Sequence, residues 1–482
     1  MKDYQLIIIG SGPAGTAAAL QAARQGMRAA VIEDDRAGGT CLNRGCVPTK
    51  TLLHASGIIA DFSREVSRGV LEGTASVNMP RLFEYKNEVC AKLSDQAAAS
   101  FKTAGIDLIE GKATLLPDRR VSVAGPSGER ILTADDVILA TGSVPYMPPI
   151  PGLDLPEVLT SDDVLSGGDH SCQSLVIIGG GVIGAEFATF FNDLGVQVTI
   201  LEGMSRILPT MDKEISQNLT RILKKRGVSV CTKAVATEIV PAELSPEVSG
   251  GAGAGVTVRF RAGDKLSSVT SERVLCAVGR RPNTEGLFDE AVLKDLVMED
   301  GRIAADERYR TSLPHVYAVG DLSSKIQLAH VAAAQGMACV KDMAGGHAAS
   351  DGRPGSGAGE PAPVPACVFT RPEIAVVGLD EQAAKEAGIA VAAGKAALYS
   401  NARTVIATDE RCFMKILAAK DDHRIVGAQL MCERSSEMIS EITEAIVNRL
   451  SPEEMLAVVR PHPTFHEALN EALRDLARRL EA

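Results

Sequence analysis

Two cysteines carry the strongest chemical signal in the sequence. They lie in the segment GGTCLNRGCVPTK, which spans Gly38 to Lys50, and Cys41 and Cys46 stand five residues apart. On a helix, a five-residue step turns the chain by about 500°, so both side chains point to roughly the same side. A modest unwinding at Gly45 would bring the two sulfurs within disulfide distance. A helix N-terminus also stabilises a thiolate, so the segment could hold a redox-active dithiol.

Other interpretations of the pair remain open on the residues alone. Two thiols that only pack in a core are common, and cysteines also bind metal ions. Metal sites usually combine two-residue spacings with a second pair of ligands, and the sequence shows no such second pair. Thr40 or Asn43 could cap a helix start nearby, and Pro48 fixes the backbone just after the second thiol. The pair alone therefore does not decide between redox chemistry and packing.

The composition excludes several classes of protein. The chain has 482 residues, enough for about two to four domains, and its hydrophobic share of 45% is ordinary for a soluble protein. A net charge of −11 disfavours a nucleic-acid partner, and no apolar run approaches the roughly 20 residues of a membrane span. Ten scattered cysteines fit a reducing compartment, and no signal or transit segment precedes the first strand. We therefore expect a cytoplasmic protein.

The elements before the dithiol predict a nucleotide site. Gln5–Ile9 is an apolar run typical of a buried parallel strand, Pro13–Gln25 has a helical pattern, and Ala29–Ile32 forms the next strand, which ends at Glu33. Three glycines at the spacing G-x-G-x-x-G join the first strand to the helix: Gly10, Gly12 and Gly15. They allow a pyrophosphate to approach the helix N-terminus, and Glu33 would accept hydrogen bonds from a ribose. Because the dithiol follows so closely, it must lie against this first cofactor, which suggests FAD.

The same pattern occurs a second time. Ser174–Ile178 reads as a buried strand, Val182–Leu194 as a helix and Gln197–Leu201 as the returning strand, which ends at Glu202. The glycines of this second turn are Gly179, Gly181 and Gly184. A carboxylate at this strand end accepts a hydrogen bond from a free ribose 2′-hydroxyl and repels a 2′-phosphate. Arg206 is the only nearby base, so the sequence predicts NAD rather than NADP.

The dithiol segment resembles the redox-active disulfide segment of the flavin-dependent disulfide reductases, the pyridine nucleotide-disulfide oxidoreductases. The resemblance runs from Tyr4 to about Glu471, apart from a Gly- and Pro-rich segment. It implies an α/β fold with two Rossmann-like domains, for FAD and NAD, and a C-terminal α+β interface domain. The expected order is an FAD domain over 1–149, an NAD domain over 150–279, an FAD return over 280–345, a connector over 346–365 and the interface domain over 366–482.

The resemblance also assigns roles around the flavin. It implies that Cys41 is the outer sulfur, which meets the substrate, and that Cys46 is the inner sulfur. Lys50 would pair with Glu186 beside the flavin, where the carboxylate limits the cost of burying the ammonium. Further cofactor contacts are implied at Thr141, Gly142, Gly279, Asp321 and Ala329.

Near the C-terminus the segment RPHPTFHEALNEAL resembles the catalytic HPT-x-x-E segment of the family. The resemblance implies that His462 is the acid–base group and that Glu467 orients its ring. The peptide bond between His462 and Pro463 could be cis. His466 departs from the family, which usually has a small polar residue there, and its effect is left open.

The reaction implied by the resemblance is the oxidation of protein-bound dihydrolipoyl groups to lipoyl, with reduction of NAD⁺ to NADH. The expected partner is a lipoylated protein of a 2-oxo acid dehydrogenase or glycine-cleavage system, and the family is homodimeric. Glu202 and the aliphatic Val182 argue against a glutathione reductase, and the tail lacks the cysteine pair of a mercuric reductase. A non-catalytic flavoprotein scaffold is a further alternative, which the retained dithiol opposes.

Overall fold

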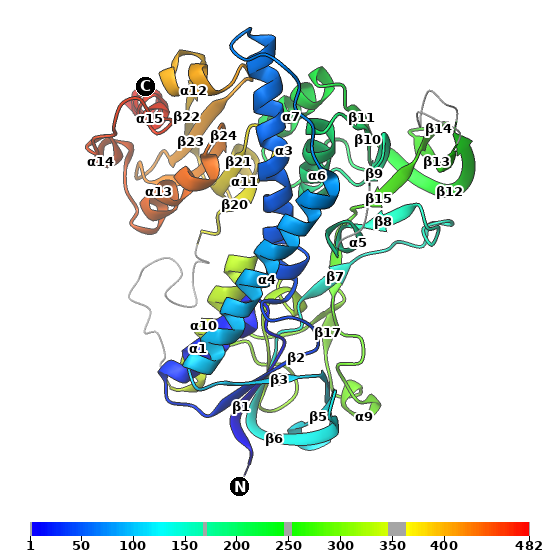
Figure 1. Ribbon diagram of the computed structural model, residues 1–482. Helices are drawn as coiled ribbons and strands as arrows, with labels where there is room; N and C mark the ends of the chain where they lie inside the picture. Colours follow the sequence, from blue (N-terminus) through cyan, green and yellow to red (C-terminus); the bar gives the residue numbers. More distant parts are fainter. Residues whose placement is uncertain (1, 167–170, 245–252, 346–362, 482) are drawn as a thin grey trace.

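The computed structural model describes residues 2–166, 171–244, 253–345 and 363–481. Residues 346–362, most of the expected connector, lie outside this part of the chain. Among the described helices, none combines the length and the apolar character that crossing a bilayer requires. The largest sheets are one mixed, one parallel and one antiparallel, each with helices beside it (Figure 1).

The first sheet lies at the bottom of Figure 1. Its parallel strands run in the order β3 (Asp107–Glu110), β2 (Ala29–Glu33), β1 (Tyr4–Ile9), β6 (Gly128–Leu139) and β19 (Val316–Ala318). Two antiparallel strands extend β6 in the order β5 (Arg120–Gly125) and β4 (Lys112–Leu115). Strand β19 comes from the expected return segment, so two distant parts of the chain build one sheet.

The apolar run of β1 is explained by burial on both faces of this sheet. Leu6 and Ile8 share a core with helices α1 (Pro13–Arg24) and α10 (Ala329–Met343), whereas Ile7 and Ile9 pack on the side of β4 and β5. Helix α10 can cross α1 closely because Gly336 has no side chain. A Cβ there would lie 2.2 Å from the carbonyl oxygen of Ala14. A strand buried on both faces reads as continuously hydrophobic, as the sequence predicted.

The second sheet repeats the order of the first four parallel strands of the first sheet, but its fifth strand precedes the other four in the chain instead of following them. It consists of β11 (Ser229–Thr232), β10 (Gln197–Glu202), β9 (Ser174–Ile178), β15 (Arg273–Cys276) and β8 (Val158–Thr160), all parallel. Helices α5 (Ser161–Ser166), α6 (Val182–Asp193) and α7 (Lys213–Lys225) accompany it, and a meander of β12 (Ala234–Leu244), β13 (Gly253–Ala262) and β14 (Lys265–Ser271) completes the region. The chain therefore holds two Rossmann-like units.

A two-stranded crossing joins the two units. Strand β7 (Ser143–Pro145) pairs antiparallel with β16 (Arg280–Pro282), where the chain enters and leaves the second unit. Beyond β16, the return segment holds short elements: α9 (Glu290–Leu293), β17 (Met298–Glu299), β18 (Arg302–Ile303) and η2 (Gly320–Leu322). The two chain segments that connect the units therefore lie side by side as paired strands.

The C-terminal sheet is antiparallel and has two differently covered faces. Its order is β20 (Ala366–Val368), β21 (Ile374–Gly378), β24 (Ile425–Met431), β23 (Phe413–Ala419) and β22 (Val391–Ala397). One face packs on helices α13 (Ser435–Val447), α14 (Pro452–Leu456) and α15 (Glu467–Glu481). The other contributes Val368, Ile374 and Phe413 to the core that contains α6 and the helix α3 (Cys46–Ser67). Two short helices, α11 (Glu381–Glu386) and α12 (Ala402–Ala407), lie in its connections.

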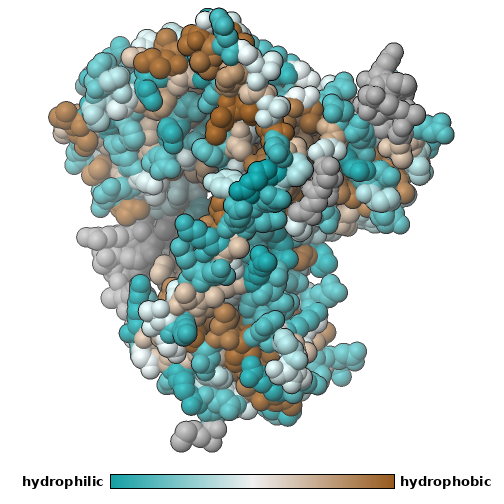
Figure 2. All heavy atoms as spheres, viewed as in Figure 1, coloured by the Kyte–Doolittle hydropathy of each residue, from teal (hydrophilic) through white to brown (hydrophobic). Residues whose placement is uncertain are grey.

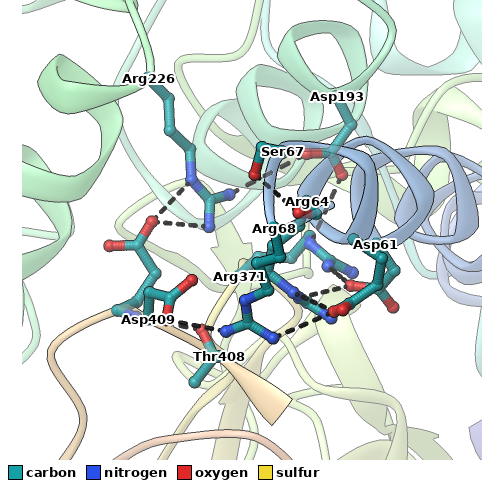
Figure 3. Close-up of polar contacts among 11 residues, drawn as sticks. Asp61, Arg64, Ser67, Arg68, Asp193, Arg226, Arg371, Thr408 and Asp409 are labelled. Carbon is teal, nitrogen blue, oxygen red and sulfur yellow. Dashed lines mark hydrogen bonds and ion pairs between the residues drawn. The ribbon is translucent and has the colours of Figure 1, made fainter. Parts of the chain in front are cut away.

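Helix α3 (Cys46–Ser67) connects all three regions. It runs beside α4 (Met79–Thr103) through the middle of the molecule, with its N-terminus toward the first sheet and its C-terminal half between the other two (Figure 1). A network of ion pairs holds that C-terminal half (Figure 3). Its main members are Asp61 and Arg64 of α3, Arg68 just after it, Asp193 of α6, Arg226 after α7, and Arg371 and Asp409 of the C-terminal region. The helix that begins with Cys46 is thus fixed by charges from the second unit and from the C-terminal region.

Candidate active site

The two cysteines lie on either side of a break between two helices. Cys41 belongs to α2 (Gly39–Asn43), and Cys46 is the first residue of α3. The unwinding falls at Arg44 and Gly45, close to where the sequence predicted it. Gly45 is needed there because a Cβ would lie 2.9 Å from the carbonyl oxygen of Thr40.

The expected helix caps in this segment are wrong. The residues that precede α2 and α3 are Gly38 and Gly45, and neither helix has a side-chain cap. The amide of Asn43 instead donates hydrogen bonds to the carbonyl oxygens of Ala37 and Gly39, at 3.2 and 3.0 Å. The glycines are used because the backbone approaches neighbouring segments too closely for larger residues, for example where a Cβ on Gly39 would lie 2.7 Å from Gly12.

The two thiols differ in their electrostatics. The Cys41 thiol donates a hydrogen bond to the Cys46 sulfur, and this bond, helped by the charge of Lys50, lowers the pKa of Cys46 to about 7. The same hydrogen bond and burial raise the pKa of Cys41 well above its usual range. Cys46 is therefore the thiolate of the pair and Cys41 the protonated partner.

Lys50 and Glu186 form the ion pair that the resemblance implied. The Lys50 ammonium lies 3.0 and 2.8 Å from the two carboxylate oxygens of Glu186, and only 5% of the Glu186 side chain is exposed. Helix α3 supplies the lysine, one turn after Cys46, and α6 supplies the glutamate. A contact that the sequence did not reveal comes from the C-terminal region, because the Phe369 N–H donates to Glu186 at 3.0 Å.

The first glycine turn has the geometry of a phosphate site. A Cβ at Gly10 would lie 2.5 Å from the carbonyl oxygen of Ala140, and one at Gly15 would lie 1.9 Å from that of Gly10. At Gly12, by contrast, a Cβ would meet no protein atom within 4 Å, and no side chain caps α1. The helix N-terminus therefore opens onto free space, as an anion site requires.

The carboxylate of Glu33 has a role that sequence reasoning missed. It is buried and accepts hydrogen bonds from the backbone N–H and the hydroxyl of Ser11, at 2.8 and 2.5 Å, and from the Asp35 N–H. Burial raises the pKa of Glu33, and the Ser11 bonds oppose that shift. Glu33 thus fixes the glycine turn itself, in addition to the expected contact with a ribose.

The second glycine turn repeats these features. A Cβ at Gly181 would meet no protein atom within 4 Å, and no side chain caps α6. A Cβ at Gly184 would lie 2.0 Å from the carbonyl oxygen of Gly179. Glu202 is buried and accepts from the backbone N–H groups of Gly180 and Met204, at 2.7 and 2.6 Å. The two sites are therefore built alike, from a glycine turn and a buried carboxylate at the end of the next strand.

Arg206, the base near this second turn, is engaged by backbone carbonyl groups that follow it in the chain. Its guanidinium donates to the carbonyl oxygens of Pro209 and Met211, at 2.9 and 3.2 Å. These bonds engage the cation with backbone that follows the turn. A 2′-phosphate beside Glu202 would therefore face a carboxylate without this arginine as its partner.

The expected flavin contacts after the strands of the first sheet lie close together. Thr141 donates its hydroxyl hydrogen bond to Asn283 O at 2.6 Å, and the Asn283 N–H donates to Gly142 O at 2.9 Å. Asp321, in η2 after β19, accepts a hydrogen bond of 2.6 Å from the Ser143 hydroxyl. Gly142 has a φ of 70°, in the left-handed region that favours glycine.

Gly279 and Ala329 flank this group. Gly279, with a φ of 124°, accepts a backbone hydrogen bond of 2.9 Å from Tyr146 where β7 and β16 cross. Arg280, next along the chain, donates to the Ser143 hydroxyl at 2.9 Å and so reaches the partner of Asp321. Ala329 is the first residue of α10. Ser143 and Arg280 were missed because their contacts span more than a hundred residues.

His462 and Glu467 form the expected dyad. Nδ1 of His462 lies 2.8 Å from Oε1 of Glu467, and the other carboxylate oxygen accepts from the Thr464 N–H at 2.9 Å. These hydrogen bonds lower the pKa of Glu467. The peptide bond between His462 and Pro463 is cis, as the sequence suggested. The imidazole is 73% exposed, and among the residues that the structure describes it hydrogen-bonds to Glu467 and to neither cysteine.

Comparison with known proteins decides the family. Residues 4–336 match the family described as pyridine nucleotide-disulphide oxidoreductase, and residues 364–473 match the dimerisation domain of that family. The chain belongs to the pyridine nucleotide-disulphide oxidoreductases. Enzymes of this family work with FAD and NAD(H), in agreement with the two cofactors that the sequence predicted.

Curated relatives and solved structures agree with this membership. A dihydrolipoyl dehydrogenase of Bacillus subtilis is 34% identical, covering 98% of this chain and 97% of the relative, and one of Chlamydia pneumoniae is 32% identical, covering 98% and 96%. Among solved structures, LpdA of Mycobacterium tuberculosis has a TM-score of 0.85 at 27% identity, covering 98% and 99%. RclA of Escherichia coli, a flavoprotein disulfide reductase induced by HOCl, has a TM-score of 0.84 at 28% identity, covering 98% of this chain and 99% of that one.

Proposed function

We propose that this disulphide oxidoreductase oxidises protein-bound dihydrolipoyl groups to lipoyl and reduces NAD⁺ to NADH. The observation that carries the proposal is the asymmetric dithiol, in which Cys46 is the thiolate at the start of α3 and Cys41 is its protonated partner. In a pair of this kind the sulfur with the lower pKa is the better leaving group, so a substrate thiolate attacks Cys41 and Cys46 leaves.

The proposed exchange begins with the Cys41–Cys46 disulfide. His462 accepts the proton of one substrate thiol, and the resulting thiolate attacks the Cys41 sulfur. The Cys41–Cys46 bond breaks, and Cys46 leaves as a thiolate, which Lys50 stabilises. The second substrate thiol then attacks the substrate sulfur of the mixed disulfide while its proton passes to the Cys41 sulfur, so the lipoyl ring closes and Cys41 is released as a thiol. Two electrons pass from the substrate to the cysteine pair.

The residues that would hold the two cofactors fit them. The glycine turn at Gly10, Gly12 and Gly15 with Glu33 would hold FAD, together with the group around Thr141, Gly142, Asp321 and Ala329. The turn at Gly179, Gly181 and Gly184 with Glu202 would hold NAD. Bound FAD supplies the two-electron relay between the cysteine pair and NAD⁺. The open space at Gly12 and Gly181 supports both assignments.

We also propose a homodimer in which the dyad of one subunit completes the dithiol site of the other. Within one chain, α15 and Glu467 lie on the opposite face of the C-terminal sheet from the core that contains α3. The C-terminal region exposes large apolar residues, and Figure 2 shows apolar atoms gathered along the upper edge over α12 and at the left near α14. The main examples are Tyr399, Val405, Ile406 and Val459. Such surfaces mark protein interfaces.

The partner under this proposal is a lipoylated protein of a 2-oxo acid dehydrogenase or glycine-cleavage system. The likeness to RclA supports a second candidate function, in which the enzyme belongs to the same family but reduces a different disulfide substrate. The two are distinguished by comparing NAD⁺ reduction by dihydrolipoamide with NADPH oxidation by glutathione disulfide. The proposal expects fast turnover in the first assay and little in the second. Fast NADPH-dependent reduction of glutathione disulfide, without dihydrolipoamide activity, would overturn it.

A further inference from the structure

A short segment of the C-terminal region touches both nucleotide-binding units. The carbonyl oxygen of Pro365 lies 2.8 Å from Nε2 of His330, in the first turn of α10. Strand β20 follows, and just after it the Phe369 N–H donates to Glu186 on α6 at 3.0 Å. The segment 365–369 is therefore tied at both ends to elements of the proposed flavin site.

The side chain of Phe369 makes a second contact at the same place. The Lys50 ammonium lies 4.7 Å from the centre of the Phe369 ring, within the range of a cation–π interaction. The Lys50 side chain is 34% exposed and flexible, so its ion pair with Glu186 does not by itself confine it. The ring adds a second wall beside the ammonium. Lys50 is thus held by a carboxylate of one unit and an aromatic ring of the C-terminal region.

The position of this ammonium matters for the reactive thiol. The positive charge of Lys50 lowers the pKa of Cys46, whereas the negative charge of Glu186 raises it. The two charges oppose each other at one sulfur, so the net effect depends on where the ammonium lies between them. The Phe369 N–H also offsets part of the Glu186 charge, because it donates to the carboxylate oxygen Oε1.

We propose that Phe369 is a positioning residue, which directs the charge of Lys50 toward Cys46 through its ring and restrains Glu186 through its backbone N–H. The C-terminal region thereby tunes the dithiol of its own chain, apart from any contribution by the dyad. This inference rests on the proposed role of Cys46 as the thiolate of the exchange. The atoms that carry it come from α3, α6 and the residue after β20.

The test is the reactivity of Cys46 in the reduced holoenzyme. The rate of alkylation by iodoacetamide is measured across pH, and the modified residue is located by mass spectrometry. In Phe369→Leu the ring is lost and the N–H remains, so we expect the pKa of Cys46 to rise. Alkylation of Cys46 at about pH 6 should then be about three- to tenfold slower, because only the thiolate reacts. Phe369→Tyr keeps the ring and should restore the wild-type profile.

A matched control is available in the same region. The Phe413 ring lies 5.0 Å from the Lys395 ammonium, and Phe413→Leu removes a comparable contact on β23. This control should leave the Cys46 profile unchanged. If Phe369→Leu fails to retain FAD, Phe369→Met keeps a similar volume without a ring and replaces it.

Two results would overturn the proposal: an unchanged Cys46 profile in a folded Phe369→Leu or Phe369→Met enzyme, or an equal shift in Phe413→Leu. The readout is independent of substrate identity. An enzyme that ignores dihydrolipoamide would contradict the proposed function, yet its Cys46 profile would still decide the role of Phe369.

Discussion

At the scale of single residues, Cys46 combines a helix N-terminus, a hydrogen bond from Cys41 and the nearby charge of Lys50, and its pKa is lowered to about 7. We predict that Cys46→Ser abolishes NAD⁺ reduction by dihydrolipoamide while FAD stays bound. The reason is that the proposed FAD contacts lie mainly in residues 10–33 and at Asp321. Turnover and flavin absorbance measure the two properties.

A control for this substitution is Cys231→Ser, in which a half-buried thiol of β11 is changed instead. It should retain the activity. Loss of FAD from Cys46→Ser, with normal turnover in the fraction that keeps it, would refute the assignment of the dithiol.

Glu202 is the residue that we expect to favour NAD⁺ over NADP⁺. We predict that Glu202→Gln lowers kcat/KM for NAD⁺ by roughly 10- to 100-fold, as expected when a hydrogen bond to a charged group worth about 1.5–3 kcal/mol is lost. It should not create strong use of NADP⁺, because Arg206 is held by the carbonyl oxygens of Pro209 and Met211. Steady-state kinetics with both cofactors measure this, and equal use of the two by the wild-type enzyme would contradict the prediction.

Some residue-level features could be predicted from the sequence and others could not. The glycine turns and the carboxylates that follow them are local patterns, so Gly10, Gly12, Glu33 and Glu202 were found directly. Contacts that cross between regions leave no local signal. Phe369 reaches Glu186 across 183 residues, and nothing in the spacing of either residue indicates it.

At the scale of elements, the ion-pair network around α3 contains a buried carboxylate. Asp193 on α6 is 4% exposed at its side chain, and Ser56 donates to it at 3.2 Å. Arg226 and Arg371 lie 3.9 Å away, and Asp61 adds a negative charge nearby. Burial raises the pKa of Asp193 to about 6, from a reference of 3.8, against the opposing effect of the arginines.

This shift gives a pH dependence of stability with a definite sign. A raised pKa means that the folded protein binds the proton more tightly, so the stabilisation is complete below about pH 4 and is lost as pH rises through about 6. Above that, the buried carboxylate costs stability. We predict that Asp193→Asn, neutral at every pH, raises the free energy of unfolding at about pH 8 by on the order of 1–3 kcal/mol.

Thermal unfolding of the FAD-bound enzyme at several pH values measures this effect. The gain should shrink toward about pH 5, where the wild-type carboxylate becomes protonated. Asp409→Asn is the matched control, because this exposed carboxylate of the same network has its pKa lowered by a hydrogen bond from Arg68. It should bring no gain, and a loss of stability in Asp193→Asn at about pH 8 would contradict the account.

The elements themselves were largely predictable. The buried strands β1 and β9 and the helices α1 and α6 follow from continuous apolar runs and glycine turns. The caps proposed at Thr40 and Asn43 were wrong because tight backbone contacts, not capping side chains, decide the dithiol segment. The domain boundaries, which rest on the resemblance, stay a prediction.

At the scale of the whole molecule, the proposed dimer makes a prediction about shared sites. His462→Ala should slow dithiol oxidation by roughly 10²–10⁴-fold, the usual contribution of a general acid–base group. Oxidation of NADH by the enzyme should be much less affected, because the dyad lies on the dithiol side. Rapid mixing with each substrate separately measures the two half-reactions.

The same variant tests whether the dyad acts between subunits. Mixing inactive His462→Ala with inactive Cys46→Ser should restore partial activity, since each mixed dimer would hold one site with both groups intact. Subunit exchange that is verified, yet restores no activity, would show that the dyad serves the cysteines of its own chain.

The central claim is that a dihydrolipoyl dithiol passes its two electrons to Cys41 and Cys46. The most direct measurement mixes the oxidised holoenzyme with a dihydrolipoyl protein, without oxygen and without NAD⁺, and counts the products by differential alkylation and mass spectrometry. We predict that lipoyl disulfide forms as the enzyme is reduced, and that both Cys41 and Cys46 gain alkylation while the alkylation of the other thiols stays unchanged. A lipoyl group that stays reduced while both cysteines remain in their disulfide would contradict it.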